Sequence, residues 1–172
     1  MKRVLLVPIL LLALIQTPAM AMGSGDKYVD AQTGLSYQIY RPTFTADLLI
    51  RSFKLLSCGP KQEKWLAAIY GEDREIQILE TDAAARCSDP GLGVQVATAT
   101  INGAKAKIIA FCDPTKPNAF KNCKTSDIKS VGGYAMWTTK PTKFLHGSSV
   151  EVLVTGFTYS QLLQVARGLK LV

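Results

Sequence analysis

The chain has 172 residues, of which 48% are hydrophobic, and a formal net charge of +7. This length suits one domain with a real hydrophobic core, and past the N-terminus no apolar segment approaches the roughly 20 residues that span a bilayer, so several membrane spans are excluded. The basic excess is uneven, because residues 103–172 hold 10 basic and 3 acidic groups, whereas residues 22–102 hold 8 and 10.

The first 21 residues contain the three parts of a secretory signal peptide. Lys2 and Arg3 form a charged start, Val4–Ile15 is an apolar run, and Ala19–Ala21 supplies the small-x-small cleavage pattern. We expect cleavage near Ala21 and export to the periplasm or the extracellular space. The alternative is an uncleaved membrane anchor, for which the apolar run is short.

Residues 22–34 are small, polar and glycine-bearing, so they are expected to be a mobile lead-in before a single domain over residues 35–172. The domain is predicted to begin with a short edge strand, because Leu35, Tyr37 and Ile39 alternate with polar residues before Arg41-Pro42 interrupts the pattern.

From Leu48 onward, the sequence predicts short strands separated by turn signals. The firmest pair flanks Asn102-Gly103, the dipeptide most typical of a two-residue type I′ hairpin. The predicted strands are Leu48–Leu56, Trp65–Tyr70, Glu75–Thr81, Val94–Ile101, Lys105–Cys112, Tyr134–Thr139 and Ser149–Thr155.

A helix closes the chain. Thr158 and Gln161 have the spacing of a capping box, and Phe157 and Leu162 the spacing of a hydrophobic staple. One apolar stripe follows, which favours packing on a sheet over the alternative of a basic amphipathic helix on a membrane. The stripe consists of Leu162, Val165, Ala166 and Leu169. We therefore expect an α+β fold, with an antiparallel sheet of about six to seven strands and the C-terminal helix packed on one face.

Four cysteines in an exported chain favour two disulfides over a zinc site. Three pairings are possible. If the strands simply run up and down, Cys58, Cys87 and Cys112 reach the same end of the sheet, and Cys123 lies in the loop that leaves that end. This order predicts the disulfides Cys58–Cys87 and Cys112–Cys123.

Several segments, in order, resemble a bacterial extracytoplasmic domain of unknown function that occurs in anti-sigma-factor-like and lipoprotein-like proteins. The resemblance covers roughly Leu35–Val172 and implies a fold and a cell-envelope location, but no catalytic residues. The segments that carry it are YQIYRPTF, WLAAIYGEDREIQILET, ATATINGAKAKI, GGYAMWTT and VEVLVTGFTYSQLLQVARGL.

Signals for catalysis are weak. The single histidine, His146, has Ser148 and Ser149 nearby in sequence but no nucleophile-elbow motif, so we interpret it as a solvent-facing loop residue. Ligands for a metal are few, and no phosphate-binding or dinucleotide motif is present, so no cofactor is expected. Trp65 and Trp137 fall in predicted strands and are expected to pack in the core or on the sheet.

The candidate site is the lysine loop, residues 113–130. Four lysines and one aromatic residue in it could bind an anionic partner, although the aromatic residues that a single-stranded nucleic acid needs are not interleaved with them. These residues are Lys116, Phe120, Lys121, Lys124 and Lys129. The sequence thus predicts an exported, non-catalytic domain that binds or senses an envelope component. The alternatives are a lipid or lipoprotein carrier and a small secreted hydrolase.

Overall fold

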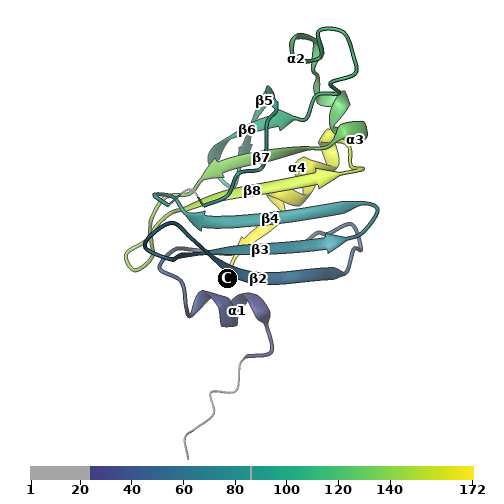
Figure 1. The fold of residues 1–172 in the computed structure, drawn as a ribbon. Coiled ribbons are helices and arrows are strands. Elements are labelled where there is room, and N and C mark those ends of the chain that lie inside the picture. The colour runs from purple at the N-terminus through teal and green to yellow at the C-terminus, as the bar shows by residue number, and fades with distance from the viewer. Residues whose placement is uncertain (1–23, 86) are drawn as a thin grey trace, which may run out of the picture.

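The computed structural model describes residues 24–85 and 87–172, and its main element is a seven-stranded antiparallel sheet with short helices around it (Figure 1). The strand order across the sheet is β2-β3-β4-β8-β7-β6-β5. The predicted leader, residues 1–21, lies outside the described residues. The strands are β2 (Ile50–Cys58), β3 (Glu63–Gly71), β4 (Glu75–Asp82), β5 (Val94–Ile101), β6 (Ala104–Ala110), β7 (Gly133–Thr138) and β8 (Ser148–Thr155).

The predicted antiparallel α+β fold is confirmed. Every strand predicted between Leu48 and Thr155 is present, with ends that differ by at most two residues. The hairpin between β5 and β6 turns at Asn102 and Gly103, whose φ angles of 48° and 79° are both positive, as a type I′ turn requires.

Helix α4 (Tyr159–Arg167) packs on one face of the sheet, behind β7 and β8 in the view of Figure 1. Its predicted capping box is present: the Gln161 amide donates to Thr158 Oγ1 at 3.3 Å, and the Thr158 amide donates to Gln161 Oε1 at 3.0 Å. The predicted apolar stripe is buried together with Phe157, but its last member, Leu169, lies beyond the end of α4. The buried sheet residues on this face, among them Ile78, Ile108 and Val152, complete the core.

The capping box gives a first prediction. Thr158→Ala removes the acceptor for one amide at the start of α4, so it is expected to lower the free energy of unfolding by about 1 kcal/mol. Urea unfolding followed by circular dichroism measures the change. Ser160→Ala, at an exposed position of the same helix, is the matched control. Equal losses in the two variants would contradict the role of the cap.

The N-terminal segment contains a helix that the sequence analysis did not predict. Helix α1 (Lys27–Gln32) begins after Asp26, whose Oδ1 accepts a hydrogen bond from the Tyr28 amide at 2.9 Å. Tyr28 is buried, and its ring meets that of Phe53 edge-on at a centroid distance of 4.9 Å. The lead-in predicted over residues 22–34 is therefore partly a packed helix, since the N-cap stabilises the start of α1 and the Tyr28 ring packs against the sheet.

The edge strand predicted over Leu35–Tyr40 is wrong. Its apolar residues are buried as the alternation indicated, but most of its backbone does not join the sheet. Instead, the Ile39 amide donates to Gln32 Oε1 at 2.9 Å, and the Tyr40 amide donates to Glu80 Oε2 at 2.8 Å. Only the end of the segment forms a strand, in a separate two-stranded sheet. Its strands are β1 (Tyr40–Pro42) and β9 (Leu169–Leu171).

The outer face of the main sheet, opposite α4, is crossed by the chain between β4 and β5. We call residues 87–93 the crossing segment; it runs over β8, β7 and β6 (Figure 1). The Tyr134 hydroxyl on β7 donates to the Gly91 carbonyl at 3.4 Å. The crossing segment carries the chain to the opposite end of the sheet. There β5 begins beside the end of β6, at the same end of the sheet at which β4 starts.

Both predicted disulfides, Cys58–Cys87 and Cys112–Cys123, are present. The placement of Cys112 at the same end as Cys58 and Cys87 is wrong, however, because the crossing segment reverses the assumed up-and-down order. The two disulfides lie at opposite ends of the sheet. Among the described residues, no helix has the length and apolar character needed to cross a membrane.

Candidate functional site

The lysine loop leaves the end of β6 and folds into three short helical segments. The Cys112–Cys123 disulfide closes its base, and the buried side chain of Ile128 anchors its second half to the core. The part that contains α2 projects beyond the sheet (Figure 1). The segments are α2 (Ala119–Asn122), the 3-10 helix η1 (Thr125–Asp127) and α3 (Ile128–Val131).

Three of the five predicted site residues lie around one shallow hollow at the tip of this loop. Lys116, Phe120 and Lys121 line it, and its volume is about 370 Å³. Phe120 is 61% exposed, which is unusual for a large apolar side chain. Lys124 and Lys129 are exposed on the same loop but do not line the hollow. The structure therefore brings together two lysines and the aromatic ring.

Two carboxylates lie near Lys116 and partly neutralise the positive charge of the loop. Lys116 Nζ lies 4.0 Å from Asp113 Oδ2 and 3.9 Å from Asp127 Oδ1. Hydrogen bonds from the Thr115 hydroxyl and amide lower the pKa of Asp113, so this carboxylate is ionised at neutral pH. Exposed ion pairs at such distances contribute at most about 1 kcal/mol, and Lys116 therefore remains able to exchange its partners for another anion.

His146 is exposed, as predicted, but it has a partner that the sequence analysis missed. Its Nδ1 lies 2.6 Å from Asp82 Oδ2, because β4 and β8 are neighbours and Asp82 is paired with Ser148 in their register. An aspartate in this position orients a histidine, as in a catalytic triad. Within the described part of the chain, however, no hydroxyl or thiol forms a hydrogen bond with the other ring nitrogen, and Ser148 instead donates to the Gln38 carbonyl.

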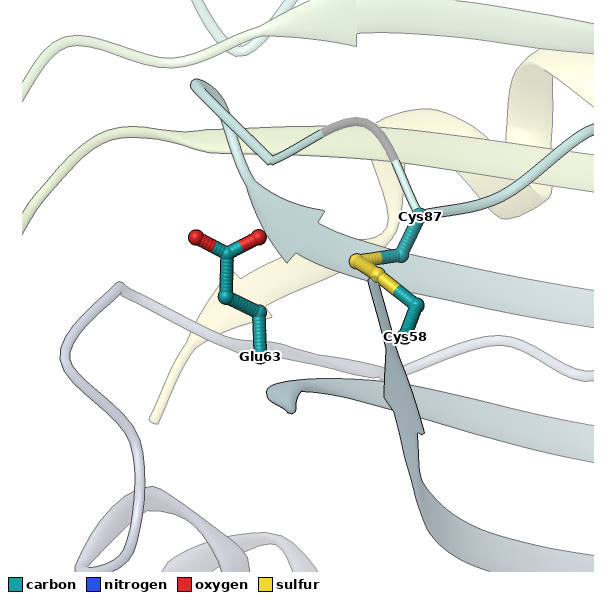
Figure 2. A group of neighbouring side chains, drawn as sticks. All are labelled: Cys58, Glu63 and Cys87. Carbon is teal, nitrogen blue, oxygen red and sulfur yellow. A yellow bond between two sulfur atoms is a disulfide. The ribbon is translucent and has the colours of Figure 1, made fainter. Parts of the chain in front are cut away.

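A second cluster combines Cys58, Cys87 and the carboxylate of Glu63, whose oxygen and sulfur atoms lie within 4.8 Å of one another (Figure 2). Thiolates beside a carboxylate are ligands that suit zinc. Here the two sulfur atoms are bonded to each other, so neither is a thiolate. The cluster is a disulfide beside a carboxylate in this state of the protein.

Glu80 is the most unusual ionisable residue of the core. It is fully buried; its Oε2 accepts the Tyr40 amide, and its Oε1 has no hydrogen-bond partner in the described residues. Burial raises the pKa of Glu80 well above its ordinary value of 4.5. In the strand segment EIQILETD, alternation places Glu80 on the same face as Ile76 and Ile78, so the pattern indicated a buried position that the sequence analysis did not identify.

Comparisons with models of protein families, with curated proteins and with solved structures found no match. The resemblance described above therefore stays a prediction. Two disulfides are typical of proteins in oxidising compartments outside the cytoplasm, which indicates an extracytoplasmic location.

Proposed function

We propose that the protein is an exported, non-catalytic domain that contacts an anionic component of the cell envelope through the lysine loop. The observation that carries this proposal is the exposed Phe120 ring between Lys116 and Lys121 on a projecting, disulfide-closed loop. An apolar ring flanked by cations suits an anionic lipid surface, where the ring enters the headgroup region and the lysines contact the phosphates.

The charge distribution supports the same proposal. The second half of the chain, which contains the loop, holds the whole basic excess, so it would attract a negatively charged surface over a Debye length of about 8 Å. The signal-peptide pattern and the disulfides support a location where such surfaces are exposed. The Cys112–Cys123 disulfide limits the number of loop conformations, which reduces the entropy lost on binding.

The two alternatives have less support. A lipid carrier needs an apolar cavity beneath α4, but Phe157, Leu162 and Val165 are fully buried there, so these side chains fill the space that a lipid would need. A hydrolase of the triad type needs a nucleophile at His146, and none is in place among the described residues.

The test is binding of the mature chain to vesicles of phosphatidylcholine with and without phosphatidylglycerol, measured by cosedimentation. A variant in which Lys116, Lys121, Lys124 and Lys129 become glutamine is expected to bind the anionic vesicles roughly 100-fold to 1000-fold more weakly, because each lysine near such a surface contributes about 1 kcal/mol. Phe120→Ala is expected to weaken binding to the same vesicles while leaving the salt dependence unchanged.

The matched control removes the same charge elsewhere, with four exposed lysines changed to glutamine. They are Lys54, Lys61, Lys140 and Lys170. Equal weakening in both sets would mean that net charge alone decides binding and that the loop is not the contact. A heparin column separates the two sources of negative charge, since retention on heparin without vesicle binding would identify a polyanion rather than a lipid surface.

A further inference from the structure

A cavity of about 510 Å³ lies between the outer face of the sheet and the segment that crosses it. Its floor comes from β6, β7 and β8, and Ser88 and Pro90 of the crossing segment form one wall. We call it the crossing cavity. It is lined by none of the residues of the lysine loop, so it does not depend on the function proposed above.

A buried carboxylate lines the floor of this cavity. Glu151 is 4% exposed, and its Oε2 has no hydrogen-bond partner among the described residues. Desolvation raises the pKa of Glu151, and the interaction with the Ser88 side chain offsets this effect only in part. A buried oxygen without a donor is costly, and an ammonium group is the ligand group that would supply both the donor and the opposite charge.

Two lysines line the crossing cavity on the side opposite Glu151. Lys105 and Lys107 of β6 line the cavity, are exposed, and form no ion pair within the described part of the chain. Lys107 is paired in register with Met136, which is paired with Glu151. The Cα atoms of Lys107 and Glu151 are therefore two strand spacings, or roughly 10 Å, apart.

This arrangement selects a ligand with separated charges. A carboxylate would contact the flexible lysines, an ammonium would contact Glu151, and Met136 between them offers an apolar surface. Two residues of extended peptide span about 7 Å, so the amino and carboxyl ends of a dipeptide fit between the two partners once the lysines lean inward. We propose that the crossing cavity binds a short peptide through its free amino and carboxyl ends, held by Glu151 on one side and Lys105 and Lys107 on the other.

The experiment is a titration of the full mature protein with dialanine, followed by NMR of the Met136 methyl group and the amides of β7 and β8. Binding is expected to shift these resonances. Two blocked forms serve as comparisons: N-acetyl-dialanine lacks the ammonium, and dialanine amide lacks the carboxylate. Each is expected to bind at least about tenfold more weakly than dialanine, as for the loss of one charge-assisted hydrogen bond.

Variants test the two partners separately. Glu151→Gln is expected to abolish the preference for dialanine over N-acetyl-dialanine. The double variant with Lys105→Gln and Lys107→Gln is expected to abolish the preference for dialanine over dialanine amide. The lysine changes are at exposed positions, so they test the site even where Glu151→Gln alters the fold. Glu72→Gln, in the exposed turn between β3 and β4, is the control and should bind like the wild type.

The proposal is overturned by an absence of shifts at Met136, or by equal binding of dialanine and its two blocked forms. The variant with four glutamines in the lysine loop distinguishes the two sites. This variant should lose vesicle binding but bind dialanine like the wild type. The two assays are independent, so a negative result in one does not decide the other.

Discussion

Glu80→Gln is expected to remove a loss of stability that the wild-type protein shows as the pH rises above about 5. The folded state holds Glu80 protonated, because burial raises its pKa, whereas the unfolded chain ionises it near 4.5. Between those two pKa values the folded state binds one more proton, so the free energy of unfolding falls by about 1.4 kcal/mol for each pH unit. A glutamine stays neutral and can still accept the Tyr40 amide.

The measurement is urea unfolding of both proteins at a series of pH values from 5 upward. The advantage of Glu80→Gln over the wild type should grow by about 3 kcal/mol over two pH units, until the pKa of Glu80 in the folded state is passed. Glu151 has a raised pKa as well and keeps a slope of the same sign in both proteins, so the difference between them isolates Glu80. Glu72→Gln is the control at an exposed carboxylate. Parallel pH profiles for the wild type and Glu80→Gln would contradict this account.

Replacing Cys58 and Cys87 by serine is expected to lower the free energy of unfolding by about 3–4 kcal/mol. The disulfide joins residues 29 apart in sequence, and its loss restores conformational entropy to the unfolded chain. It also ties the start of the crossing segment to the end of β2, which is an edge strand. Thermal and urea unfolding measure the loss, and hydrogen exchange should show faster opening of the crossing segment.

The other disulfide provides the comparison. Replacing Cys112 and Cys123 opens a shorter loop, with a separation of 11, so the expected loss is smaller, roughly 3 kcal/mol at most. Faster exchange should then appear in the lysine loop and leave the crossing segment unchanged. A loss for Cys58 and Cys87 below that for Cys112 and Cys123 would contradict the loop-length argument.

Local signals were sufficient for most of the sheet. The type I′ hairpin at Asn102 and Gly103 and the capping box at Thr158 were predictable because each depends on the conformational preferences of a few adjacent residues. The buried stripe of α4 was predictable for a similar reason, since its spacing follows from the helical repeat. The disulfide pairing was right although one of its premises was wrong, because only the proximity of each cysteine to its partner mattered.

The candidate sites were less predictable. Lys116, Phe120 and Lys121 share a hollow as expected, since they lie within one short, closed loop. Asp82 beside His146 was missed, because the two residues are 64 positions apart and meet only through the pairing of β4 with β8. The contact between Glu80 and Tyr40 was missed for the same reason, together with the side-chain hydrogen bonds that replace strand pairing before β1.

The sequence alone determined the strands, the hairpin and the closing helix, because these features depend on backbone preferences and on the period of apolar residues along the chain. Only the tertiary structure decided which strands are neighbours, which end of the sheet holds Cys112, and that Glu151 is buried. Each of these depends on the path of the crossing segment or on contacts between distant residues. Such contacts are selected by the packing of the whole core, and no local pattern in the chain encodes them.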